Sequence, residues 1–221
     1  MVGDRSGAQG HFLVEMVSMP WYHLLKGRTK GKYPMSLTFK FDIEKTIAAV
    51  AYLMQRENGK LDMFLSIKML YLADKQSFVS WGKTITGDSF ASLPKGPVLR
   101  NTCNLFKGVG TAKNLKEWNS YFSETVNNSI HLLRDVNFDR LSEREMEVLE
   151  KARQEVNSCA PWDVAKWLHE TCPEWRDPHG SSRPIDPTVI LRNAGRTEDE
   201  ILMIEESTET FNQLEEVFGN I

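Results

Sequence analysis

The sequence lacks a long hydrophobic run, and it is poor in cysteine. No stretch approaches the roughly 20 consecutive apolar residues that cross a bilayer as a helix. The most apolar early stretch, residues 12–22, is interrupted by Glu15 and Pro20, and it has neither the basic start nor the small-residue exit of a secretory signal. The three cysteines are widely spread: Cys103, Cys159 and Cys172. The sequence therefore predicts no membrane partner and no disulfide scaffold, and we expect a cytoplasmic protein.

The chain has no large excess of one charge, but its charges are unevenly placed. The 27 Lys and Arg residues nearly balance the 30 Asp and Glu residues, so the total gives no reason to expect a nucleic acid or another polyanion as partner. Residues 1–41 carry six basic and two acidic side chains, whereas residues 196–221 carry one basic and eight acidic side chains. Residues 42–195 carry twenty of each. The two ends are therefore where charge can select a partner.

What the sequence does contain is a set of helical patterns with recognisable starts. Asp42 is a suitable N-cap, and Ser142 with Glu145 and Thr197 with Glu200 form capping boxes. Apolar residues at helical spacing predict helices over residues 43–56, 61–79, 97–107, 114–124, 142–156, 161–170 and 189–191, and an acidic helix after position 197.

The strand signals are short and few. Alternating patterns predict strands at residues 84–86 and 89–93, joined by a turn at Gly87 and Asp88, and a further strand at 130–133. The expected fold class is therefore mainly α, a compact helical domain with a small antiparallel β-hairpin.

Composition divides the chain into three parts. Residues 1–34 form a polar, glycine-rich lead whose basic run, residues 26–32, is either a solvated tail or a polyanion-binding arm, and Met35 is an alternative start. Residues 35–195 are expected to form one domain, and residues 196–221 an acidic helical segment.

No pattern in the sequence places a catalytic group. Gly82-Lys83-Thr84 is similar to the end of a phosphate-binding loop, but the position that requires the first glycine holds Ser77, inside an expected helix. No nucleophile elbow of the G-x-S-x-G type is present. Asp74 and Asp88 could pair as carboxylates, or serve as a buried anchor and a turn residue, respectively.

One group of metal-ligating side chains lies in the last third of the chain: Cys159, His169, Cys172 and His179. Its intervals are too wide for the tight ligand pairs of structural zinc sites, so we expect buried cysteines and a hydrogen-bonded histidine. The sequence predicts no catalytic residue, no metal ion and no cofactor.

Three tryptophans crowd into fourteen positions: Trp162, Trp167 and Trp175. Aromatic residues at this density are typical of a buried core. They are also typical of a binding hot spot, because Trp supplies a large and rigid contact area.

Six motifs in order resemble those of one family. The first half of the chain has Leu70-Tyr71-Leu72-Ala73-Asp74-Lys75, Ile85-Thr86-Gly87-Asp88 and Pro94-Lys95-Gly96-Pro97. The second half has Leu141-Ser142-Glu143-Arg144-Glu145, Pro161-Trp162-Asp163, and His169 followed by Pro173-Glu174-Trp175. Over residues 43–204 the chain resembles the Panacea domain, the SocA-like antitoxin domain of bacterial and phage toxin–antitoxin systems. The family-motif residues are Leu70, Tyr71, Asp74, Lys75, Gly87, Asp88, Pro94, Gly96, Pro97, Trp162, His169 and Trp175.

The resemblance implies an antitoxin, without catalysis, in a prophage or a phage-defence system. Such a protein binds a cognate toxin protein and neutralises it, either by direct inhibition or by delivery to a AAA+ protease. Toxins that act on nucleic acid are often basic, so the candidate toxin-contacting residues are the acidic ones near the end of the chain. These are Glu198, Asp199, Glu200, Glu205, Glu206 and Glu209.

Two other functions stay open at this point. One is a DNA-binding regulator of its own operon, because the basic lead could contact phosphates, although no expected helix carries a basic recognition face. The other is an enzyme with an unrecognised site that uses Asp74 and His169.

Overall fold

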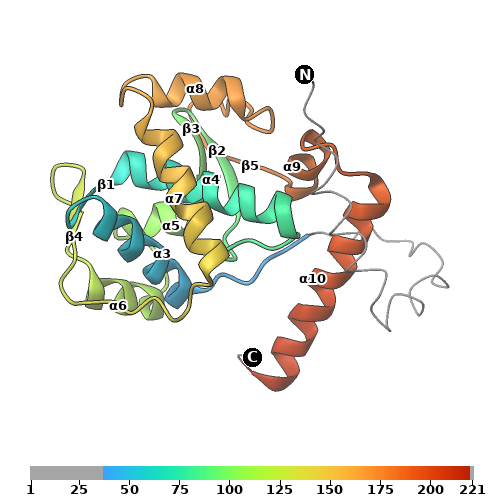
Figure 1. The fold of residues 1–221 in the computed structure, drawn as a ribbon, viewed down its shortest axis with the longest axis horizontal. Helices are drawn as coiled ribbons and strands as arrows, with labels where there is room; N and C mark the ends of the chain where they lie inside the picture. The colour runs from blue at the N-terminus through green and yellow to red at the C-terminus, as the bar shows by residue number, and fades with distance from the viewer. Residues whose placement is uncertain (1–36, 220–221) are drawn as a thin grey trace, which may run out of the picture. The chain divides into compact units, whose positions relative to one another are not determined.

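The computed structural model describes residues 37–219, so the lead over residues 1–34 lies outside the described residues. The expected mainly α fold is confirmed: the described residues form eight helices and two small antiparallel sheets (Figure 1). The helices are α3 (Ile43–Arg56), α4 (Met63–Trp81), α5 (Arg100–Phe106), α6 (Ala112–Tyr121), α7 (Glu143–Asn157), α8 (Val164–Thr171), α9 (Pro187–Asn193) and α10 (Glu198–Phe218). The strands are β1 (Lys60–Asp62), β2 (Phe90–Leu93), β3 (Gly96–Leu99), β4 (Ser129–His131) and β5 (Arg183–Pro184).

The helix α4 is the buried centre of the fold. It is apolar around most of its circumference and packs against α3, α7, α9 and the strand β3 (Figure 1). Asp62 caps its start by accepting from Leu65 N at 3.0 Å, and Gly82 ends it in the left-handed conformation, with φ of 71°. The sequence placed this start two residues too early, because residues 60–62 pair as the strand β1 with β4.

The three predicted helix starts at Asp42, Ser142 and Thr197 are confirmed. Asp42 accepts from Lys45 N at 2.9 Å, and both capping boxes are present. The helix α3 ends at Arg56, and Asn58 and Gly59, just beyond its C-cap, both have positive φ, as predicted. By contrast, α8 begins at Val164 and not at residue 161, because residues 161–163 form turns.

The β-hairpin lies later in the chain than predicted. β2 pairs with β3, and Pro94-Lys95 is the turn between them. Pro97 is therefore a residue of β3 and does not start a helix. The short strand β5 pairs with the other edge of β2, which gives the strand order β3-β2-β5.

Residues 84–86, predicted as the first strand of the hairpin, form a loop instead. Ile85 N and Thr86 N donate to Asp74 Oδ1 at 3.0 and 3.1 Å, and the Thr86 hydroxyl donates to Asp74 Oδ2. Because a side chain of α4 takes these donors, they are not available to a neighbouring strand.

The first turns of α10 pack against the rest of the fold. Ile201 and Ile204 are its buried residues, and Ile204 lies against Gly82. Arg196, just before the helix, donates to Val79 O at 2.8 Å. In Figure 1, α10 leads from the vicinity of α9 to the lower edge of the view.

Candidate functional site: a buried motif network and an exposed helix

The motif residues of α4 meet those that follow α8 in a buried network. Tyr71 donates its hydroxyl to Glu174 Oε1, and Lys75 Nζ lies 2.7 Å from the same oxygen. Glu174 and Tyr71 are fully enclosed, whereas Lys75 reaches solvent in part. Burial, followed by the negative charge of Glu174, raises the pKa of Tyr71 well above its ordinary value, so the phenol stays protonated and serves as a donor.

A buried cation, Lys68, fixes the hairpin to α4. Lys68 Nζ donates to Pro97 O at 2.9 Å, and burial lowers the pKa of this amine to about 8. Gly96, with φ of 102°, leaves little room beside it, because an added Cβ would lie 3.3 Å from Lys68 Nζ. The glycine of the Pro-x-Gly-Pro motif is therefore required both for its backbone conformation and for this close approach.

His169 and Trp175 form a stacked pair beside the hairpin, and His169 lies near Gly96, as Lys68 does. Their ring centroids lie 3.7 Å apart with an interplanar angle of 13°, and Trp175 Nε1 donates to Leu93 O at 2.9 Å. His169 Nε2 is buried without a hydrogen-bond partner among the described residues, and the ring stacks on Trp175. Burial and the nearby Lys68 lower the pKa of His169, which favours the neutral imidazole.

Asp74 and Asp88 are both anchors for backbone groups. Asp74 binds the loop described above, and burial raises its pKa to about 7. Asp88 was expected in a turn, but it is buried and accepts from Asn101 N at 2.9 Å and Thr102 N at 2.7 Å, the first turn of α5. It therefore satisfies the start of a helix that has no side-chain cap of its own.

The other family-motif residues lie apart from these networks. Leu70 is in the core, Pro94 is exposed in the hairpin turn, and Gly87 lies beneath the segment that leads into α3. Trp162 is 80% exposed, whereas Trp175 is partly buried. The tryptophan cluster is thus divided between surface and interior.

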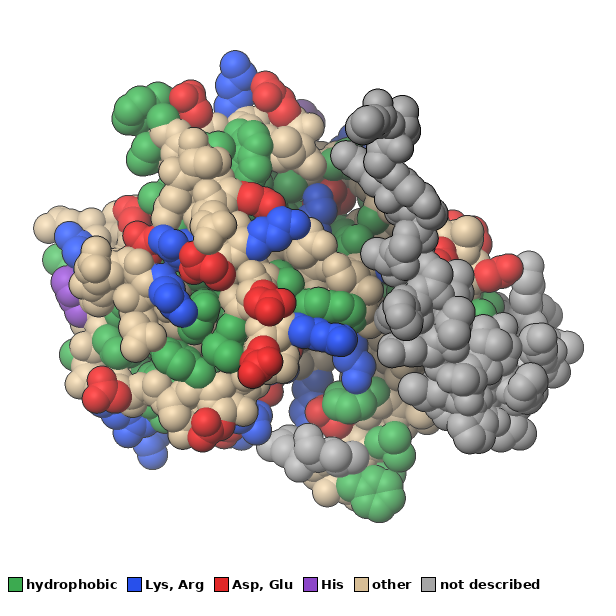
Figure 2. Space-filling model, viewed as in Figure 1, with side chains coloured by type: hydrophobic (Ala, Val, Ile, Leu, Met, Phe, Trp, Pro, Cys, Tyr) green, Lys and Arg blue, Asp and Glu red, His purple; other side chains and the backbone are tan. Residues whose placement is uncertain are grey.

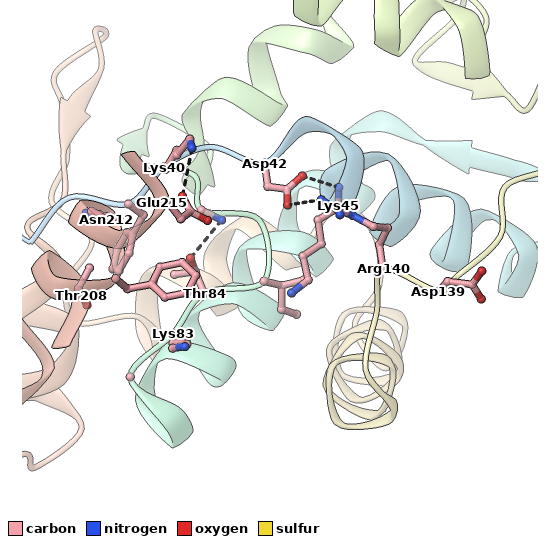
Figure 3. A pocket seen from close by; sticks show the side chains of 15 residues that line it. Lys40, Asp42, Lys45, Lys83, Thr84, Asp139, Arg140, Thr208, Asn212 and Glu215 are labelled. Atoms are coloured by element: carbon pink, nitrogen blue, oxygen red, sulfur yellow. Dashed lines mark hydrogen bonds and ion pairs between the residues drawn. The ribbon is translucent and has the colours of Figure 1, made fainter. Parts of the chain in front are cut away.

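A groove of about 410 Å³ lies between the segment before α3, the loop after α4 and one face of α10 (Figure 3). Its four cations each have a partner in the chain. Lys40 pairs with Glu215 at 3.2 Å, Arg140 with Asp42 at 3.1 Å and Lys45 with Glu145 at 2.6 Å, and Lys83 lies over the ring of Phe211 at 4.6 Å. The contacts of Lys40 with Glu215 and of Lys83 with Phe211 connect the second half of α10 to the rest of the fold.

The six acidic candidates of α10 have unequal freedom. Glu198 makes a bidentate pair with Arg192 at 2.7 and 3.1 Å, and Glu200 closes the capping box and pairs with Arg196 at 3.1 Å. Glu205 is partly buried, and burial raises its pKa. Asp199 and Glu209 are exposed, and Glu206 is half-buried.

Residues 67–176 match the model of one protein family, described as the SocA-like antitoxin, Panacea domain. The matched range contains the buried network, from Lys68 to Trp175. This chain carries a Panacea domain of the SocA-like antitoxin family. Family membership supports an antitoxin role with a toxin partner in general, and it indicates a role that is not enzymatic. No curated protein and no solved structure gives a significant match.

The expected absence of a metal ion and of a membrane span, and the DNA-binding alternative, concern a chain that the structure describes only in part. Within residues 37–219, no cluster of His, Cys, Asp and Glu side chains could hold a metal ion, and no helix there is long and apolar enough to cross a membrane. The basic run of residues 26–32, which carries the DNA-binding alternative, lies outside the described residues.

Sequence reasoning missed two members of the buried network, Lys68 and Glu174. A lysine inside the apolar run from Ile67 to Leu72 was the available signal, because a cation on a buried helix face needs an internal acceptor. For Glu174 no comparable signal exists, since its partner Tyr71 is 103 positions away.

Proposed function

We propose that this protein is a cytoplasmic antitoxin that binds a cognate toxin protein, holds it inactive and performs no catalysis itself. The observation that carries the proposal is the family match over the residues that build the buried network. The network supports a binding role, because it joins a hairpin, a central helix and the segment after α8 into a rigid body that loses little entropy on association.

The reactive side chains of the network favour binding over chemistry. Lys68, Tyr71 and Asp74 are each no more than 2% exposed. A substrate cannot reach them without opening the core, although an amine with a pKa of about 8 could serve as a base if it were accessible. These groups instead satisfy backbone and side-chain partners within the domain.

The acidic helix α10 supplies a surface of the expected charge for a basic toxin. Of the six candidates, Asp199, Glu206 and Glu209 are the ones that we assign to toxin contact. Glu198 and Glu200 have partners within the chain, in Arg192 and in the capping box, so their first role is to hold the start of α10.

The test is neutralisation in cells. The open reading frame adjacent to this gene is expressed from an inducible promoter, with and without this protein, and colony formation is counted. We expect the neighbour alone to stop growth and co-expression to restore it, with a stable complex in a pull-down. A neighbour that is harmless, or toxicity that persists despite soluble expression of this protein, would overturn the proposal.

The same cells separate the two modes of neutralisation. In a host that lacks its AAA+ proteases, a direct inhibitor still protects, and the toxin persists at a normal level. An adaptor fails to protect there, and in the normal host it shortens the lifetime of the toxin.

A further inference from the structure

The C-terminal half of α10 carries an exposed apolar stripe, whose first residue, Phe211, lies under Lys83 and whose other residues have no ring or polar contact among the described residues. Phe211, Leu214, Val217 and Phe218 are 39%, 43%, 73% and 71% exposed, and their spacing of three, four and seven positions places them on one side of the helix. Figure 2 shows hydrophobic side chains gathered at the lower end of the molecule, where Figure 1 places the end of α10. We name these four residues the apolar stripe. Exposed apolar groups in such an array mark an interaction surface.

The charge of α10 restricts what can cover the stripe. Between Glu198 and Phe218 the helix has eight acidic residues and no Lys or Arg. Glu216 lies within the turns of the stripe itself, Glu206 and Glu209 precede it, and Glu215, on the same turns, already pairs with Lys40. A partner that buries the stripe must therefore bring positive charge beside its own apolar residues.

We propose that the apolar stripe binds a basic amphipathic helix of the toxin, packed along the second half of α10. This rests on the proposed function and names the surface and the chemistry of the contact. A helix is the shape that matches a stripe of spacing three and four, since its own apolar residues recur at the same interval. The lysines or arginines beside them face the carboxylates of α10.

A second copy of the chain is the weaker occupant. Pairing two α10 helices would bring one acidic helix against another without a Lys or Arg on either helix, even though Glu198, Glu200 and Glu215 have basic partners elsewhere in the chain. The same repulsion disfavours an anionic lipid surface.

The first experiment uses the full chain and two synthetic peptides as probes. Both peptides have the length of α10 and a leucine stripe at the same spacing, one flanked by lysines and the other by glutamates. We expect the lysine peptide to bind and its affinity to fall as salt rises from about 0.05 to 0.5 M. The glutamate peptide is not expected to bind. Binding is measured by fluorescence anisotropy, and equal binding of both peptides would overturn the proposal.

A matched pair of triple variants locates the contact. Leu214→Ser, Val217→Ser and Phe218→Ser together should lower the affinity for the lysine peptide at least about tenfold. The control carries Val109→Ser, Val126→Ser and Leu133→Ser, which are 56%, 63% and 60% exposed on other parts of the fold. Sedimentation of the free variants checks the alternative occupant. A stripe variant that changes the mass of the free chain makes the stripe a self-interface and overturns the proposal.

A toxin-neutralisation assay distinguishes the proposal about the apolar stripe from the proposed antitoxin function. If the unsubstituted chain neutralises the toxin and the stripe variant does so equally well, the stripe is not the toxin site, while the antitoxin function stands. If the unsubstituted chain itself fails to neutralise, the antitoxin function is the proposal that is wrong. The expected result is protection by the unsubstituted chain and by the control, and loss of protection with the stripe variant.

Discussion

The carboxyl group of Asp74 is a buried acid of the motif residues, and its protonation links folding to pH. Burial raises its pKa from the ordinary range to about 7, against the effect of three donors that favour the ionised form. In the unfolded chain the same carboxyl titrates near pH 4. Between about pH 4 and 7 the folded chain therefore holds more protons than the unfolded chain, and the stability that this group contributes falls as pH rises.

The variant Asp74→Asn tests this dependence, because the amide does not titrate. We expect the free energy of unfolding of the unsubstituted protein, minus that of the variant, to decrease as pH rises from about 4 to 7. Urea unfolding at several pH values gives the difference. Burial also raises the pKa of Asp88. Because Asp88 is present in both proteins, its contribution to the pH dependence largely cancels in the difference. A difference that grows with pH would show that the donors, and not burial, control this carboxyl.

Two tryptophans of the family motifs have opposite roles, which a pair of substitutions separates. Trp175 stacks on His169 and donates to Leu93 O, so Trp175→Ala should lower the free energy of unfolding by about 2–4 kcal/mol. Trp162 is 80% exposed, so Trp162→Ala should change it by less than about 0.5 kcal/mol. Denaturant unfolding followed by circular dichroism measures both. A large loss from Trp162→Ala would contradict its position at the surface.

The chemistry of single residues was predictable where the partner is local and not where it is distant. The N-caps at Asp42, Ser142 and Thr197 follow from patterns within four positions, and all three are confirmed. The role of Asp88 was missed because its carboxylate accepts from the amides of residues 101 and 102. The turn propensity of position 88 does not reveal contacts so far along the chain. Glu174 was missed for the same reason.

At the scale of elements, the loop from position 83 to 89 explains why the predicted hairpin was misplaced. The residues have strand propensity, but the side chain of Asp74 binds the amides that a strand would need. Thr86 O accepts instead from Asp42 N at 2.9 Å, which fixes the start of α3 to this loop. Local propensity predicted an extended backbone, and tertiary contacts decided what it pairs with.

The segment before α3 crosses this loop at Gly87. We therefore expect that only glycine is tolerated at this position. Its φ is 66°, and a Cβ there would lie 1.9 Å from Lys40 O. Gly59 has a similar φ of 79° with nothing within 4 Å of an added Cβ, so it is the matched control. Each alanine substitution should lower the free energy of unfolding by about 1 kcal/mol, because alanine is strained at positive φ. Gly87→Ala should lower it by at least about 2 kcal/mol more because of the clash, as measured by denaturant unfolding. Equal losses would contradict the close crossing.

At the scale of the whole molecule, charge and burial are distributed differently. The residues from 42 to 195 carry equal numbers of acidic and basic groups and contain most of the core, whereas α10 carries eight acids and buries only Ile201 and Ile204. The acidity of α10 was evident from the sequence. The apolar stripe within it was overlooked, because whether a residue such as Leu214 is covered depends on which face of the helix packs against the core.

This distribution predicts that α10 governs the rate of toxin association. Replacing Asp199, Glu206 and Glu209 by their amides should slow association with a basic toxin about tenfold at low salt and change dissociation much less. The difference should vanish near 0.5 M salt, where screening acts over only about 4 Å. Surface plasmon resonance at several salt concentrations measures both rates.

The control for this prediction removes the same amount of charge elsewhere. Glu124, Asp135 and Glu147 are exposed on other elements, and their amide variants give an equal change in net charge. If the control slows association as much as the α10 variant, steering comes from the total charge of the protein and not from its acidic helix. If neither variant changes the rate, the toxin surface that meets this protein is not basic. The α10 variant alone should slow association, because steering depends on charges near the contact and weakens beyond about one Debye length.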